Sequence, residues 1–180
     1  MMREDLDRIL ITKERIAERV KSLAAEIKKD FGDEDLIMVC ILRGSCYFFA
    51  DLTKELDNFV TLEFMSVTSY GSGTTSSGEV RIINDISCPI EGKNVIVVED
   101  IIDTGFTLSY LKRILTERRP KALKICALLD KPSRRETSID GDYVGFVIPN
   151  EFVVGYGLDY AQKYRNIPEI GILKKDVYSK

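Results

Sequence analysis

Residues 94–111, NVIVVEDIIDTGFTLSYL, bring acids, hydroxyl side chains and a glycine together directly after an apolar run. The run holds β-branched residues at 95–98, a composition typical of a buried strand. Apolar residues at helical spacing follow from position 108. The polar residues between these two elements are Glu99, Asp100, Asp103, Thr104, Gly105 and Thr107. In open α/β sheets such strand-to-helix junctions bind ligands, so we expect a site here.

The residues from Asp103 to Thr107 have the composition of a phosphate-binding junction. A helix N-terminus offers unpaired N–H groups and the positive end of its dipole to an anion. The hydroxyls of Thr104 and Thr107 add donors, and Gly105 lets the backbone approach closely. The segment has neither the Walker A spacing nor the G-x-G-x-x-G spacing. We therefore expect a phosphate site of a different kind.

The carboxylates need another role, because they repel phosphate. Ionised Glu99 and Asp100 are acceptors only, which suits the vicinal hydroxyls of a ribose. They could equally hold Mg²⁺ while phosphate oxygens complete its shell. Asp103, nearer the helix, could accept a proton. Together these groups predict a ribose 5-phosphate ligand. The alternative is that Glu99 and Asp100 are surface acids and Asp103 is a helix N-cap.

The composition excludes several classes of enzyme. None of the 180 residues is histidine, so a Ser-His-Asp triad, a His-based zinc site and an imidazole base are impossible. Acid–base chemistry must therefore come from carboxylates, Lys, Tyr or Cys. The four cysteines form no C-x-x-C pair and show no metal-ligand spacing. Cys40 and Cys126 lie within apolar runs, where we expect them to be buried and reduced.

The net charge and the hydropathy of the chain limit the kinds of partner that it can bind. The net charge of −3 argues against a general nucleic-acid binder. The longest apolar run, 36–42, is too short to span a bilayer, so we expect no membrane partner. The first residues, MMREDLDRIL, are charged where a signal peptide needs an apolar core. These features predict a cytoplasmic protein.

Hydrophobic periodicity predicts one α/β domain over residues 1–180. Apolar residues from Ile16 to Ile27 have helical spacing, with Thr12 as N-cap and Gly32 beyond the end. Strands are expected at 36–42, 61–70, 79–86, 94–100 and 122–131, with helices ending near Leu56 and before Pro120. Short strands are expected from residue 143. Buried strands alternating with amphipathic helices predict a parallel twisted sheet flanked by helices.

Four segments together resemble the type I phosphoribosyltransferases. VIVVEDIIDTGFTL resembles their phosphoribosyl-diphosphate-binding motif, and ILRGS their pyrophosphate loop. SYGSGTTSSG resembles the flexible hood, about residues 69–79, which Ser69 and Tyr70 begin. DK at 130–131, with YVGFVIPNEFVVGYGLDYAQKYRNIPEIGIL, is similar to the purine-recognising part of the hypoxanthine-guanine enzymes. The resemblance implies the type I fold with a small hood.

The resemblance assigns roles around the phosphoribosyl group. It implies that Asp103 is the catalytic proton acceptor near purine N7. It places Mg²⁺ on Glu99, Asp100 and Asp159. The residues implied to bind ribose and the 5′-phosphate are Glu99, Asp100, Asp103, Thr104, Gly105, Phe106 and Thr107. Phe106 departs from the family, where this position varies.

Further roles follow for pyrophosphate and purine. The resemblance implies pyrophosphate contacts from Arg43, Gly44 and Arg165, and a cis peptide at Leu42-Arg43. It also implies that Lys131 donates to the purine O6, which adenine lacks, so that adenine is rejected. Phe152 would stack on the purine and the Val153 backbone would contact its edge. Without the resemblance, Lys131 could be a solvated strand end and Phe152 a core residue. Glu151 stands where relatives carry Lys.

The resemblance therefore implies a purine salvage enzyme. It would join hypoxanthine or guanine to 5-phospho-α-D-ribosyl 1-diphosphate, with Mg²⁺, and release pyrophosphate. Relatives are dimers or tetramers, so we expect a homo-oligomer with small-molecule substrates. A xanthine-preferring or broader 6-oxopurine enzyme is the nearer alternative. A regulator that senses phosphoribosyl diphosphate and binds nucleic acid is the alternative from another class.

Overall fold

The computed structural model describes residues 2–70 and 79–179, and for Ser69, Tyr70 and Glu79 it describes the backbone only. The remaining residues of the predicted hood, 71–78, lie outside the described part. The backbone of Ser69 and Tyr70 ends strand β3 (Val60–Tyr70), and Glu79 begins β4 (Glu79–Asn84).

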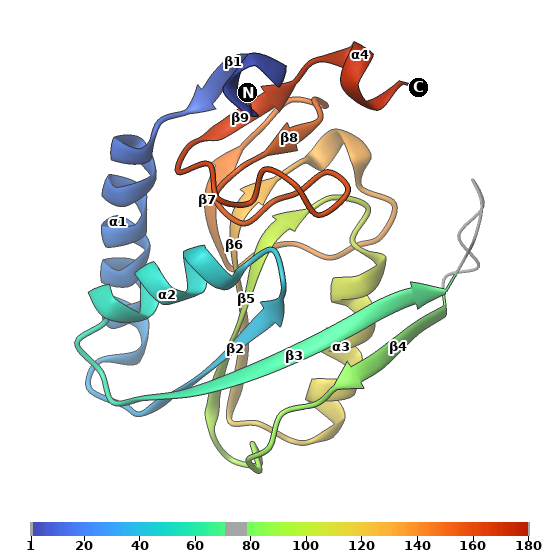
Figure 1. The fold of residues 1–180 in the computed structure, drawn as a ribbon. Coiled ribbons are helices and arrows are strands. Elements are labelled where there is room, and N and C mark those ends of the chain that lie inside the picture. Colours follow the sequence, from blue (N-terminus) through green and yellow to red (C-terminus); the bar gives the residue numbers. More distant parts are fainter. Residues whose placement is uncertain (1, 71–78, 180) are drawn as a thin grey trace.

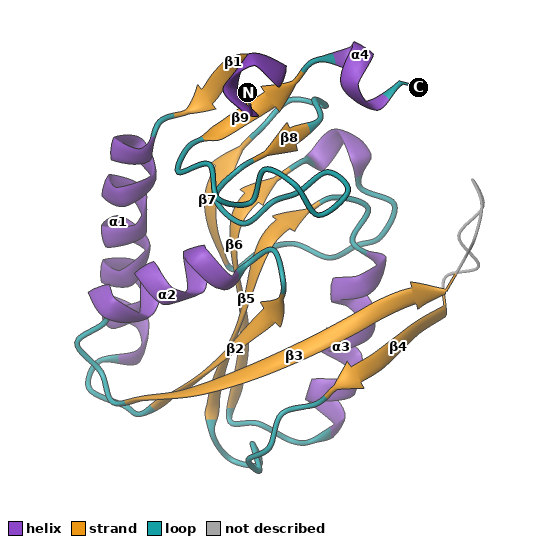
Figure 2. Ribbon diagram, viewed as in Figure 1, coloured by secondary structure: helices purple, strands orange, loops and turns teal. Residues whose placement is uncertain are grey.

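A six-stranded sheet forms the centre of the molecule, with the order β4-β3-β2-β5-β6-β7 (Figures 1 and 2). Its other strands are β2 (Leu36–Leu42), β5 (Asn94–Ile102), β6 (Ala122–Asp130) and β7 (Tyr143–Val147). All neighbours are parallel except β3 and β4. The predicted α/β sheet is confirmed, and it is mixed because residues 71–78 are too few for a crossover connection.

Helices cover both faces of this sheet (Figure 1). The apolar stripes of α1 (Lys13–Phe31) and α2 (Cys46–Glu55) pack with Met38 and Cys40 of β2 on one face. The stripe of α3 (Phe106–Glu117) packs on the other face, where alternate β5 residues such as Val95 and Val97 point. Strands buried on both faces explain the unbroken apolar runs in the sequence.

The predicted boundaries of α1 are confirmed. The Thr12 hydroxyl accepts a hydrogen bond from the Arg15 N–H at 3.4 Å, and Gly32 has a φ of 58°. Cys40 and Cys126 are buried as expected, and burial raises the pKa of the Cys40 thiol to about 11. At neutral pH this thiol is therefore protonated and packs as a small apolar group.

A second, three-stranded antiparallel sheet was not predicted. Its order is β1-β9-β8, from β1 (Leu6–Ile11), β9 (Ile170–Leu173) and β8 (Val153–Val154). It pairs the first and last parts of the described chain and lies beyond the carboxyl ends of β5 and β6 in Figure 1. Three short helices complete the fold: η1 (Met2–Asp5), η2 (Pro132–Arg134) and α4 (Lys175–Tyr178). None of the described helices is long and apolar enough to cross a bilayer.

Candidate active site

A cavity of about 320 Å³ opens at the carboxyl ends of β2 and β5. Parallel strands end at a common edge, so residues that follow β2 and β5 meet there. The cavity brings together predicted site residues from three separated segments, 43–44, 99–107 and 159–165. Those that line it are Arg43, Gly44, Glu99, Asp100, Asp103, Thr104, Gly105, Thr107, Asp159 and Arg165.

Glu99 and Asp100 form the acidic part of this cavity. They lie within β5, as expected, and the strand continues to Ile102, two residues beyond its predicted end. Burial raises the pKa of Glu99 well above its ordinary value, and the negative charge of Asp100 is the second cause of this shift. Burial also raises the pKa of Asp100, although hydrogen bonds and the Arg165 charge oppose the shift. Two acids held this close favour a cation or hydroxyl donors between them.

The turn after β2 passes directly over Asp100. A Cβ placed on Gly44 would lie 1.6 Å from Asp100 Oδ2, so only glycine fits at this position. The peptide bond between Leu42 and Arg43 is cis, as the resemblance implied. The Arg43 side chain borders the cavity and its guanidinium donates weakly to Gln162 Oε1 at 3.4 Å. Arg43 and Asp100 therefore both line the cavity at this tight turn.

Arg165 supplies a second cation on the same side. Its Nη2 lies 2.8 Å from Asp159 Oδ1, and its Nη1 donates to the Gly157 carbonyl at 2.6 Å. The Arg165 side chain is only 22% exposed, it lines the cavity, and these two partners hold its guanidinium in place. Arg43 and Arg165 thus provide positive charge where an anion would bind.

The start of α3 forms another part of the cavity wall. Gly105 is the N-cap with a φ of 89°, and a Cβ on it would lie 2.3 Å from Thr137 Oγ1. Asp103 lies two residues before this cap, so the alternative role of Asp103 as the N-cap is wrong. Phe106 is 40% exposed and is not among the residues that line the cavity. The free N–H groups of the first turn therefore face the cavity with Thr104 and Thr107.

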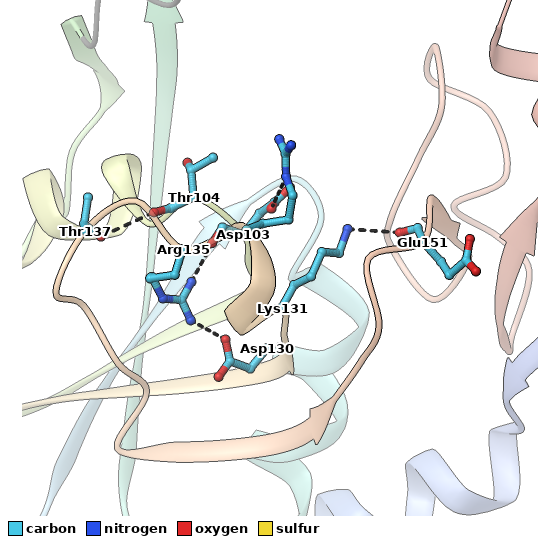
Figure 3. A network of polar contacts seen from close by, with 8 residues as sticks. Asp103, Thr104, Asp130, Lys131, Arg135, Thr137 and Glu151 are labelled. Atoms are coloured by element: carbon cyan, nitrogen blue, oxygen red, sulfur yellow. Dashed lines mark hydrogen bonds and ion pairs between the residues drawn. The ribbon is translucent and has the colours of Figure 1, made fainter.

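The predicted purine residues lie beside this cavity but do not line it. Lys131 follows β6 and is only 7% exposed, which excludes a solvated strand end. Its Nζ donates to the Glu151 carbonyl at 3.0 Å, and burial lowers its pKa. The Glu151 carboxylate is turned away from Lys131, toward Arg8 at 3.9 Å (Figure 3). The ammonium thus links the end of β6 to the segment before β8.

Phe152 is partly exposed, at 36%, and is not a core residue. Its ring is stacked on that of Tyr178 with centroids 4.7 Å apart, and it meets Tyr160 edge-on at 5.6 Å. Val153 begins β8 and is buried. An aromatic ring held by two others, next to a buried amine, is suited to a planar heterocycle.

Two arginines near Asp103 were missed from the sequence. Arg134 Nε donates to Asp103 Oδ1 at 3.2 Å, and Arg135 Nη1 donates to the Asp103 carbonyl at 2.6 Å. Arg135 also pairs with Asp130 Oδ1 (Figure 3). Both arginines belong to the segment that follows Lys131. The only sequence signal was a basic pair in a polar segment, which is usually a solvated surface.

The carboxylates of the cavity are possible ligands of Mg²⁺. Within residues 2–70 and 79–179, no group of three Cys, Asp or Glu side chains is arranged to hold a metal by itself. Asp159 is paired with Arg165, which leaves Glu99 and Asp100 as adjacent carboxylates. Mg²⁺ in phosphate-binding sites typically uses one or two carboxylates and takes its other ligands from phosphates and water. The residues present fit that pattern.

Known proteins share this arrangement. A family model described as the phosphoribosyl transferase domain matches residues 7–161. The hypoxanthine-guanine phosphoribosyltransferase of Bacillus subtilis is 48% identical over 178 residues, which are 99% of this chain and 99% of that protein. The bifunctional protein TilS/HprT of Listeria innocua is also 48% identical over 178 residues, but the chain spans only 28% of its length.

Solved structures agree with these sequence matches. A hypoxanthine phosphoribosyltransferase of Staphylococcus aureus superposes with a TM-score of 0.96 at 48% identity, covering 99% of this chain and 97% of that one. A hypoxanthine-guanine phosphoribosyltransferase of Bacillus anthracis gives 0.90 at 49% identity, covering 94% and 99%. The chain therefore belongs to the phosphoribosyl transferase family, in the branch of the hypoxanthine-guanine phosphoribosyltransferases.

Proposed function

We propose that this chain transfers the 5-phosphoribosyl group of 5-phospho-α-D-ribosyl 1-diphosphate to hypoxanthine or guanine. The products are IMP or GMP and pyrophosphate. One observation carries the proposal: a single cavity joins an acid pair, a helix N-terminus with hydroxyls, and two cations. These three groups match the ribose, the 5′-phosphate and the diphosphate of the donor substrate in chemistry.

The ribosyl phosphate would bind along the β5–α3 junction. In this proposal Glu99 and Asp100 accept hydrogen bonds from the two ribose hydroxyls. The N–H groups and hydroxyls from Thr104 to Thr107 donate to the 5′-phosphate. Mg²⁺, held by Glu99 and Asp100 with Asp159 nearby, would supply charge stabilisation for the departing diphosphate.

Cleavage of the C1–O bond leaves negative charge on the pyrophosphate. Arg43, the Gly44 amide and Arg165 would stabilise this charge, and Arg165 is already held in place by Asp159 and the Gly157 carbonyl. As that bond breaks, purine N9 bonds to C1, and the proton on N7 passes to Asp103. A carboxylate suits this step in a chain with no histidine.

The purine would lie between the β5–α3 junction and Phe152. Lys131 keeps donors free beyond its bond to Glu151, and one of them would reach O6 of the base. Adenine presents a second donor at this position and would be rejected. The ring of Phe152 would stack on the base, and the Val153 backbone would contact its edge. Because the Glu151 side chain faces Arg8, its departure from Lys in relatives leaves this stacking intact.

A spectrophotometric assay tests the proposal. The purified chain, phosphoribosyl diphosphate and Mg²⁺ are mixed separately with hypoxanthine, guanine, xanthine, adenine or uracil. Turnover of hypoxanthine and guanine but not adenine is expected. Preferred turnover of xanthine would favour the broader 6-oxopurine enzyme. No turnover with any base, together with a nucleic-acid gel shift at physiological salt, would favour the regulator.

We further propose that residues 1–180 act as one phosphoribosyltransferase domain in a cytoplasmic homo-oligomer, a dimer or tetramer. The oligomer is supported by exposed apolar side chains on β3 and directly before it: Phe59 is 84% exposed, Leu62 49% and Phe64 42%. Burial of such a row is a common reason for self-association. Light scattering after size-exclusion chromatography measures the mass. A monomer at micromolar concentration would contradict the oligomer.

A further inference from the structure

We propose that Arg135, which lies outside the groups assigned above, is a positioning residue for the transfer reaction. Its guanidinium fixes Asp103 and Lys131 relative to each other. Asp103 can then contact N7 of the purine while Lys131 contacts O6 of the same base. This inference rests on the proposed function, because it concerns residues assigned there to the base.

Arg135 contacts both strand ends that carry these residues (Figure 3). Its Nη1 donates to the Asp103 carbonyl at 2.6 Å, and its Nη2 pairs with the carboxylate of Asp130, the residue before Lys131. Ile102 and Asp130 are register partners on β5 and β6. The Lys131 N–H in turn donates to the Ile102 carbonyl at 3.0 Å. One side chain therefore ties the ends of two neighbouring strands together just before they enter the site.

The stem of Arg135 also packs on the phosphate junction. A Cβ on Gly105 would lie 3.3 Å from Arg135 Cδ, so the stem lies directly against this glycine. The side chains of Arg135 and Asp130 are only 12% and 13% exposed. Water therefore competes little for these bonds. The arginine is built into the wall of the site rather than resting on its surface.

The geometry requires a guanidinium. A carbonyl oxygen and a carboxylate on different strands are reached by two nitrogens of one rigid, planar group. A lysine keeps the charge and most of the stem, but its single ammonium cannot occupy both nitrogen positions. The buried Nε of Arg135 has no partner among the described residues. Burying an unsatisfied donor is unfavourable, which is consistent with a role in holding the site at some cost to stability.

The remainder of the phosphate junction does not depend on this side chain. The Glu136 N–H donates to the Thr104 carbonyl at 3.0 Å, and Thr137 Oγ1 donates to the same oxygen at 3.4 Å. Loss of the guanidinium should therefore disturb the purine contacts more than the binding of the 5′-phosphate. This difference separates a positioning role from a general loss of folding.

Arg135→Lys and Arg135→Ala test the proposal, with Arg19→Lys and Arg19→Ala as matched controls. Arg19 makes the same kinds of bond elsewhere, to the carbonyls of Val144 and Gly145 and to the Glu26 carboxylate. Arg135→Lys should lower kcat/KM for hypoxanthine by about 100-fold, because small misplacements of reacting groups have effects of this size. The KM for phosphoribosyl diphosphate should change less than about threefold. Millimolar guanidinium should partly restore Arg135→Ala but not change Arg19→Ala.

Two results would overturn the proposal. One is an Arg135→Lys variant whose kcat/KM for hypoxanthine stays within about twofold of that of Arg19→Lys. The other is equal loss toward both substrates with no guanidinium rescue, which would indicate a purely structural role. If the parent chain itself turns over no base, the proposed function fails. Amide hydrogen exchange at Lys131, whose N–H donates to the Ile102 carbonyl, then decides the matter, since Arg135→Lys should speed this exchange and unchanged exchange would refute the positioning role.

Discussion

Replacing Glu99 by glutamine should stabilise the ligand-free chain. Burial and the Asp100 charge raise the pKa of Glu99 above its ordinary value of 4.5. Such an acid binds its proton more tightly in the folded than in the unfolded chain. Stability is therefore greatest below the ordinary pKa and falls as the pH rises through the folded-state pKa. Above its ordinary pKa this acid therefore costs stability, and Glu99→Gln removes that cost.

The size of the gain follows from the surroundings of the acid. Single stabilising substitutions, improved charges among them, commonly add about 0.5–2 kcal/mol. Glu99 and Asp100 border an open cavity, where water screens them, so the gain should not exceed this range. A chain of this size gains about 2–4 °C in Tm per kcal/mol. The Tm should therefore rise by about 1–8 °C, while activity falls because the ribose contact is lost.

Calorimetric unfolding of the ligand-free chain from about pH 4 to about pH 8.5 measures this effect. The gain should be small at the acid end and grow toward neutral pH. Glu63→Gln is the matched control, because Glu63 is also buried but accepts bonds from Ser87 N and Oγ at 2.8 Å and Cys88 N at 3.2 Å.

The Glu63 control should behave in the opposite way. Hydrogen bonds, led by that from the Ser87 amide, lower the pKa of Glu63. Its contribution to stability is therefore present above 4.5 and lost as the pH falls, and Glu63→Gln should lower the Tm at neutral pH. A lower Tm for Glu99→Gln at neutral pH, or a gain independent of pH, would refute the reasoning about the acid pair.

Three further substitutions test the roles proposed for the site. Lys131→Met should lower kcat/KM for hypoxanthine about 10- to 100-fold, because a charged hydrogen bond to the base is lost. An unchanged kcat/KM in steady-state assays would show that Lys131 does not recognise the base. Asp103→Asn should lower kcat about 10²- to 10⁴-fold while calorimetry still detects IMP binding, whereas full turnover would exclude Asp103 as proton acceptor. Gly44→Ala places a Cβ 1.6 Å from Asp100 Oδ2. The KM for phosphoribosyl diphosphate should therefore rise at least about 10-fold. An unchanged KM would show that the turn can move to accommodate the methyl group.

Local patterns were enough to predict much of the framework. The helix at 13–31, its Thr12 cap and its Gly32 end follow from spacing and capping residues that act within one turn. The strands β2, β5 and β6 follow from continuous apolar runs. The junction from Asp103 to Thr107 followed from residue types at a strand-to-helix boundary. Each of these features depends on neighbours in the sequence.

The small sheet and the role of Arg135 could not be predicted in this way. β1 pairs with β9, so that Leu6 lies opposite Leu173, and neither strand has a stable form without the other. The sequence alone predicts that Arg135 is an ordinary surface cation, whereas the structure shows its bond to the Asp103 carbonyl. The direction of the Glu151 side chain likewise depends on Arg8.

The sequence by itself determined the long helices and the strands of the large sheet, the acids and hydroxyls at the end of β5, and, through four motifs, the family. Only the tertiary structure decided which side chains share a cavity and which ones hold them there. The physical reason is the range of the forces. Capping, periodicity and turn chemistry act over a few residues. The contacts of Gly44 with Asp100, of Lys131 with Glu151 and of Arg135 with Asp103 join residues far apart in the chain, and they exist only after the sheet has formed.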